Sequence, residues 1–133
     1  MLKQLFKILK FPLLVLVVHV LATVLGWYAN IEHFDKLMHA LGGMSIAVGT
    51  FSLYSLLRQR KLVGTNHLLV ISIAVVAIVV STAVAWEWME FLIDTLTGSH
   101  MQISLTDTMG DLLAGTLGGT IISLAKLFLP HKK

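Results

Sequence analysis

Acidic side chains in this sequence gather in three short stretches, each beside a long apolar run. The seven carboxylates are those of Glu32, Asp35, Glu87, Glu90, Asp94, Asp107 and Asp111. His39 follows Asp35 by four residues, so the two side chains share one face of a helix. Carboxylate oxygens together with an imidazole nitrogen bind Mg²⁺, Mn²⁺, Fe²⁺ or Zn²⁺, and the composition does not choose among them. The residue types therefore predict a divalent metal site.

The elements that carry these residues are strongly apolar. Hydrophobic residues make up 56% of the chain, charged residues 13%, and the mean hydropathy is +0.85. Such values indicate an integral membrane protein, and 133 residues allow at most four spans of roughly 20 residues each. We therefore expect an all-α fold, an integral membrane four-helix bundle forming a single domain. Its helices are predicted at approximately 11–29, 36–57, 66–96 and 106–129.

The first apolar segment resembles a secretory signal peptide because Lys3, Lys7 and Lys10 precede it. It is nevertheless long enough to span a bilayer, and it ends on Trp27 and Tyr28, which suit a membrane interface. No clear cleavage site follows. The sequence therefore favours an uncleaved spanning helix.

Basic residues predict the orientation of the bundle. Nine of the ten fall on one side of the predicted helices: Lys3, Lys7, Lys10, Arg58, Arg60, Lys61, Lys126, Lys132 and Lys133. Only Lys36 falls on the other side. Because lysine and arginine collect on the cytoplasmic side, both termini are predicted to be cytoplasmic and the acidic face to point outward, to the periplasm or cell exterior.

Helix geometry sorts the outer polar residues into two layers. A rise of about 1.5 Å per residue brings His39, Glu87 and Asp111 to similar depth. Asp35, Glu90 and Asp107 form a layer one turn further out. The same faces continue inward through Gly42, Ile46 and Gly49 on the second helix, Ala83 and Val80 on the third, and Ala114, Gly118 and Ala125 on the fourth, with Gly115 beside them. Their small residues predict close helix packing.

These acids are poorly compensated, since Lys36, His39 and His100 are the basic groups nearby. Crowded carboxylates persist near a low-dielectric region when they are protonated, paired or bound to metal. The hypothesis is that a divalent metal ion is held by four residues, His39, Glu87, Asp107 and Asp111. Glu90 and Asp35 are the candidate catalytic groups, acting as base or as outer partners of the ligands.

The alternative interpretation is an ordinary polar cap at the helix ends. It is favoured for Glu32, Asp94 and His100. His19, in the middle of the first helix, is interpreted as a hydrogen-bonded core histidine. Trp86 and Trp88 are interpreted as interfacial anchors.

Several of these residues fall in a recognisable motif. The stretch from Asp35 to Gly42, Asp-Lys-Leu-Met-His-Ala-Leu-Gly, resembles the D-x-x-x-H-x-x-G stretch of the YjdF-type bacterial inner-membrane family. Trp86-Glu87 and the later Asp107-Thr108-x-x-Asp111 resemble two further segments of that family. VanZ-like proteins are more distantly similar, with an asparagine where this chain has Gly115. The resemblance implies that the acidic and histidine positions form one motif in a bacterial cytoplasmic (inner) membrane. It implies no particular reaction.

Three functions remain open from the sequence. The first is a metal-dependent hydrolase, transferase or binding site for an envelope lipid or lipid-linked substrate. The second is a cation- or proton-coupled transport component, and the third is a non-catalytic accessory membrane subunit. A thin four-helix bundle also favours a homodimer, whereas the basic residues are topology signals and predict no nucleic-acid partner.

Overall fold

The computed structural model describes residues 2–64 and 67–129. It is all-helical, which confirms the predicted fold class, and four of its helices are long and apolar enough to cross a membrane. The helices are α1 (Leu2–Val24), the short α2 (Trp27–Asn30), α3 (Phe34–Gln59), α4 (Leu68–Thr97) and α5 (Leu105–Phe128).

The observed bounds differ most from prediction in the first helix. α1 begins at Leu2 instead of residue 11 and ends at Val24 instead of residue 29. It stops because Gly26 adopts a left-handed backbone with φ 68°, after which the chain forms α2 as a separate turn. The predicted start of the third helix, residue 66, lies outside the described residues, and α4 begins at Leu68.

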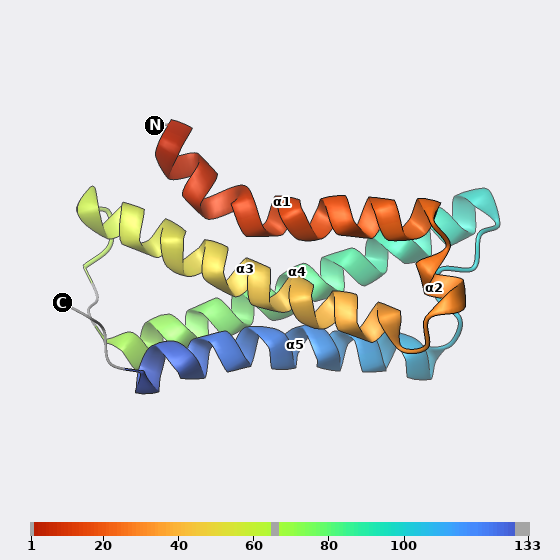
Figure 1. Ribbon diagram of the computed structural model, residues 1–133. Helices are drawn as coiled ribbons and strands as arrows, with labels where there is room; N and C mark the ends of the chain where they lie inside the picture. Colours follow the sequence, from red (N-terminus) through yellow and green to blue (C-terminus); the bar gives the residue numbers. More distant parts are fainter. Residues whose placement is uncertain (1, 65–66, 130–133) are drawn as a thin grey trace.

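The two ends of the bundle differ in charge. One end of the bundle holds the start of α1, the end of α3, the start of α4 and the end of α5 (Figure 1). We name it the lysine end. The opposite end carries α2, the start of α3, the end of α4 and the start of α5, and we name it the acidic end. The described charged side chains therefore segregate along the bundle as the sequence predicts, while the membrane side that each end faces stays a prediction.

Backbone contact between α3 and α5 forms the centre of the fold. A Cβ atom built on Gly43 would overlap the carbonyl oxygen of Gly115, and one built on Gly118 would overlap the carbonyl oxygen of Ala40. The two helices thus approach more closely than side chains would allow. Small residues were predicted on these faces, but Gly42 was the wrong glycine on α3, since a Cβ atom there would meet nothing within 4 Å.

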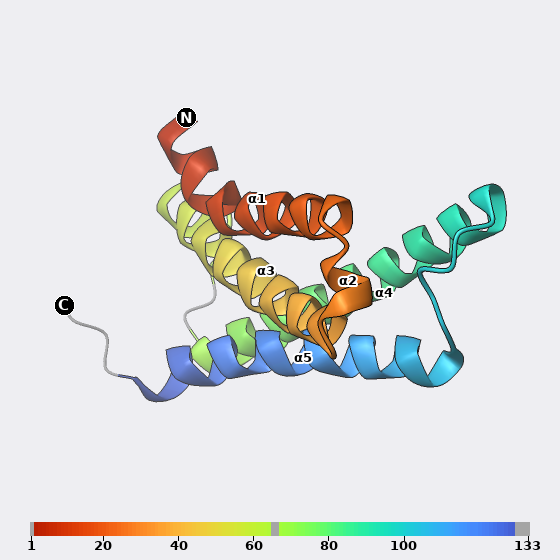
Figure 2. The ribbon, with the colours of Figure 1, turned by 45° about the vertical axis from the view of Figure 1, so that its right-hand side comes forward.

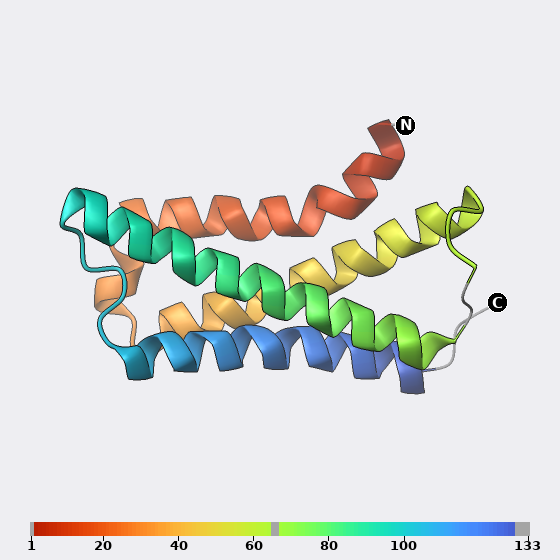
Figure 3. The same ribbon diagram turned by 180° about the vertical axis from the view of Figure 1, so that it is seen from behind.

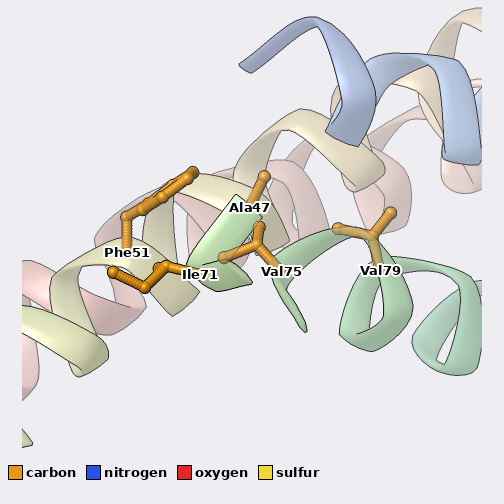
Figure 4. Close-up of a cluster of buried hydrophobic side chains, with 5 residues drawn as sticks. All are labelled: Ala47, Phe51, Ile71, Val75 and Val79. Atoms are coloured by element: carbon orange, nitrogen blue, oxygen red, sulfur yellow. The ribbon is translucent and has the colours of Figure 1, made fainter. Parts of the chain in front are cut away.

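α4 packs against α3 and α5 in the half of the bundle nearer the lysine end. Buried Ala47 and Phe51 of α3 meet Ile71, Val75 and Val79 of α4 in one apolar cluster (Figure 4). Val79 also occupies the space beside Gly119 of α5. The predicted inward residue Val80 is 37% exposed, whereas Ala83, predicted on the same face, lies beside Gly115 of α5.

Towards the acidic end, α4 diverges from α5. The connection of residues 98–104 runs back across the gap to the start of α5 (Figure 2). The view from behind shows the same divergence (Figure 3). Here side chains and the connecting loop, and not close backbone packing, hold the two helices together.

α1 lies over α3 and stands apart from α5 (Figure 2). It is bent in its first half, where Pro12 interrupts the helical hydrogen bonds. Its closest approach uses Gly49 of α3, where an added Cβ atom would lie 2.8 Å from the carbonyl oxygen of Ile8. α1 is therefore the most loosely packed of the four long helices.

The adjacent glycines of α3 give a matched test of the central contact. Gly43→Ala should lower the free energy of unfolding by about 1–3 kcal/mol, because the new methyl group forces α3 and α5 apart. Gly42→Ala should be neutral or stabilising, because it meets open space and improves helix propensity. Unfolding midpoints in detergent micelles measure both. Equal midpoints for the two variants would show that the α3–α5 contact is not tight.

Candidate metal centre

Three helices bring polar side chains together at the acidic end. His39 comes from α3, Glu87 and Glu90 from α4, and Asp111 from α5. The exposed fractions of Glu87, Glu90 and Asp111 are 4%, 7% and 3%. Buried carboxylates require compensation, since an unpaired charge in an apolar region is costly.

The imidazole of His39 lies at the centre of this group. Its Nε2 atom is 3.5 Å from Asp35 Oδ1 and 3.6 Å from Glu87 Oε1. The possible ligand atoms of Asp35, His39 and Asp111 all lie within 4.8 Å of one another. The same holds for those of His39, Glu87 and Glu90. Four of the other five predicted site residues therefore lie close to His39.

One carboxylate oxygen of Glu87 accepts a hydrogen bond and the other has no hydrogen-bond partner. Gln102, in the loop before α5, donates from Nε2 to Glu87 Oε2 at 2.8 Å and to the Glu87 carbonyl at 2.9 Å. The other oxygen, Oε1, is buried and has no hydrogen-bond partner within the described structure. This oxygen points towards His39 at a separation longer than a good hydrogen bond. Among the carboxylate oxygens of the described residues, it is the fully buried one that lacks a hydrogen-bond partner.

Lys36 supplies part of the missing positive charge. Its Nζ atom donates to Asp107 Oδ1 at 2.7 Å and to Asp111 Oδ1 at 3.3 Å. These bonds join the start of α3 to the start of α5, about two turns outside the Gly43–Gly115 contact. Sequence reasoning named Lys36 as a nearby base but did not anticipate that it would bridge both aspartates.

The structure places Asp107 apart from the other predicted ligands. Its carboxylate contacts Lys36, and it belongs to neither group of converging ligand atoms. Asp107 lies in the first turn of α5, where its backbone N–H donates to the side chain of the N-cap residue Ser104. The hydrogen bond from Lys36 accounts for the position of this side chain.

Asp94 has a structural role in the loop that covers Glu87. Its carboxylate accepts hydrogen bonds from the Ser99 hydroxyl and from the backbone N–H groups of Met101 and Gln102. These bonds fold residues 98–104 into the shape that presents Gln102 to Glu87. Gln102 was missed by sequence reasoning, because an amide in a loop carries no periodic signal.

An aromatic group borders the centre on the side of α1. The Tyr28 hydroxyl lies 2.6 Å from His19 Nδ1, and the ring of His19 meets Trp86 edge to face at 5.1 Å. Trp86 Nε1 donates to Glu90 Oε1 at 2.8 Å. Burial raises the pKa of the Tyr28 hydroxyl, with the Asp35 and Glu90 carboxylates adding to the shift, so the phenol stays protonated.

These contacts revise the predicted roles of two aromatic residues, Trp86 and Tyr28. His19 is hydrogen-bonded as expected. Trp86 is not an exposed anchor, because it holds Glu90 and touches His19. Tyr28 likewise turns inward to His19. Trp88 is 68% exposed, as an interfacial anchor would be.

The centre contains more acidic groups than basic ones. The carboxylates of Asp35, Glu87, Glu90, Asp107 and Asp111 face one lysine, Lys36, and one imidazole, His39. A divalent cation would offset much of the excess, and the donor set of imidazole and carboxylates suits such an ion.

The fold and these contacts define a helical membrane protein with four candidate spans and a buried acidic and histidine cluster at one end. Residues 4–132 match the model of a family described as "Predicted membrane protein (DUF2238)". The chain belongs to this family, which is the YjdF family, so the predicted resemblance is confirmed. The more distant VanZ-like resemblance is not supported. No curated protein and no solved structure matches the chain.

The bridge made by Lys36 can be tested by charge removal. Lys36→Met should lower the free energy of unfolding by about 1–3 kcal/mol, because buried Asp111 and its neighbour Asp107 lose their donor. Lys7→Met, at an exposed position of the lysine end, should change it little. Denaturant titrations in micelles measure both.

Combining Lys36→Met with Asp107→Asn and Asp111→Asn should recover part of the loss, since the uncompensated charges are then removed. A Lys36→Met protein as stable as the Lys7→Met protein would contradict the bridge.

Proposed function

We propose that this protein binds a divalent metal ion at the acidic end of the bundle and uses it to bind or act on an envelope lipid or lipid-linked substrate. The observation that carries the proposal is the unsatisfied Glu87 Oε1 beside His39 Nε2, both buried. A buried acceptor without a donor is costly, and a cation bound between the two groups would remove that cost.

The spacing of the candidate ligands supports a metal. Two ligand atoms on a common tetrahedral ion, each about 2.1 Å from it, lie about 3.4 Å apart. The His39 nitrogen lies 3.5 Å and 3.6 Å from oxygens of Asp35 and Glu87. These distances are long for hydrogen bonds and suit a shared ion. His39, Glu87 and Glu90 form the first candidate ligand set, and Asp35 and Asp111 complete the shell.

The surroundings support a lipid-like substrate. The carboxylates of Asp35 and Glu90 and the His39 ring lie at the polar end of a cavity whose other walls are mostly apolar. A substrate with an apolar part would reach the metal from within the bilayer. For a hydrolytic reaction, the metal would supply an activated water, and whichever of Glu90 and Asp35 is not bound to the ion would accept the proton of that water.

We further propose that the protein lies in the bacterial cytoplasmic membrane with its acidic end outward. Basic side chains at the other end support this orientation through the excess of lysine and arginine on the cytoplasmic side. The substrate would then be met in the outer leaflet.

Metal binding is tested with purified protein. Stripped wild-type protein should bind Zn²⁺ or Mn²⁺ at about one ion per chain in equilibrium dialysis read by elemental analysis. His39→Ala and Glu87→Gln should each weaken binding by at least roughly tenfold, because even outer partners of metal ligands contribute that much. Glu32→Gln is the matched control, since Glu32 is acidic, lies at the same end and is exposed.

Wild-type protein that binds neither ion would refute the metal site. Equal binding by the Glu32→Gln and Glu87→Gln variants would refute the ligand assignment.

Orientation is tested with single cysteines, since the chain has none of its own. His100→Cys, exposed at the acidic end, should react with a membrane-impermeant thiol reagent in bacterial cells whose outer membrane has been removed and whose cytoplasmic membrane is intact. Gly64→Cys, exposed at the lysine end, should react only after lysis. The reverse pattern would place the acidic end in the cytoplasm.

A further inference from the structure

A cavity of about 250 Å³ runs from the metal centre towards the middle of the bundle. Its polar end is formed by Asp35, His39 and Glu90, and its apolar end by Pro12, Ile46 and Val79. Along α3 the lining spans positions 35 to 46, which is about 16 Å at the rise of a helix, or half the hydrocarbon thickness of a bilayer. We name this cavity the α1–α4 cleft.

The cleft opens sideways between α1 and α4. In the described part of the chain, no Cα atom of α1 lies within 8 Å of a Cα atom of α4 or α5. His19 and Trp86 meet across the gap near the acidic end. Further inward, Leu16 on one side and Thr82 on the other line the cleft and are themselves exposed. The gap between the two helices therefore faces the region that lipid chains occupy.

The residues that line the cleft determine which kind of molecule can bind in it. Most of it is apolar, so hydrocarbon fits the cleft better than water does. The volume lies below the roughly 300–1,000 Å³ of ordinary ligand pockets, which suits one chain and not two. At the polar end, carboxylates remain in excess of Lys36 even with one divalent ion bound, and this repels an anionic head group.

We propose that the α1–α4 cleft binds one hydrocarbon chain of a membrane amphiphile, which enters sideways between α1 and α4 and places a hydrogen-bond-donating head group without negative charge against Asp35 and Glu90. The inference deepens the proposed function by naming the substrate class of the same site, and the chain-binding part of it does not require the metal.

Trp86 provides a reporter within the cleft. The chain has three tryptophans, so Trp27→Phe with Trp88→Phe leaves Trp86 as the single emitter. The probes are bromine-labelled dodecyl chains carrying an amine, a hydroxyl or a sulfate head, added to protein in unlabelled micelles. The amine and hydroxyl probes should quench Trp86 saturably, and the sulfate probe should bind roughly tenfold more weakly.

Gly42 offers a way to fill the cleft without disturbing the helix contacts. It lines the cleft, and a Cβ atom there meets nothing within 4 Å. Gly42→Leu should weaken the saturable quenching by about tenfold, since a filled cleft excludes at least two methylene groups of the probe. Ala85→Leu is the matched control, at similar depth on α4 but exposed and outside the lining. Thr82→Leu fills the cleft from the other wall and repeats the test if Gly42→Leu fails to fold.

Three results would overturn the inference. They are quenching that never saturates, equal quenching in the Gly42→Leu and Ala85→Leu proteins, and tightest binding of the sulfate probe. A change from dimer to monomer in the Gly42→Leu protein would also overturn it, because a second copy would then cover the cleft. Metal binding by the same preparations separates the two proposals. Loss of saturable quenching with metal retained refutes the cleft alone, and saturable quenching without metal refutes the metal site alone.

Discussion

Close backbone contact between α3 and α5 is the constraint on which the site depends. Gly43 follows His39 by one helical turn, and Gly115 follows Asp111 by one turn. The contact of these glycines therefore brings the imidazole and the buried carboxylate together directly above it. Within a bilayer, apolar side chains gain little by leaving lipid for protein, so close packing and polar contacts must hold the helices. Glycine allows both here, because it lets the backbones approach until the polar side chains meet.

Polar contacts then determine how the open end of the bundle is held. α4 diverges from α5 at the acidic end, and the Lys36 bridge and the Gln102 bonds to Glu87 span the space that packing leaves. These contacts satisfy one oxygen of Asp111 and one of Glu87. They leave Glu87 Oε1 without a hydrogen-bond partner, and the proposal of a metal site depends on this atom.

The loose packing of α1 gives the site its access. α1 contacts α3 at Gly49 and leaves a gap towards α4 except where His19 meets Trp86. A helix that packed tightly on both neighbours would close the cleft. The same aromatic contact holds Glu90 through the Trp86 N–H group, so the position of α1 is linked to a candidate catalytic carboxylate.

Sequence alone determined the four long apolar helices and the segregation of charge, because hydropathy and charge are local properties of the chain. Tertiary structure decided which groups meet. Gly43 and not Gly42 makes the contact, Val79 and not Val80 is buried, and Asp107 pairs with Lys36. Helical phase predicts a face to within about one residue, or 100°, whereas a contact depends on how neighbouring helices rotate and cross. Gln102 lies in a loop without periodicity, so only the folded chain could bring its amide to Glu87.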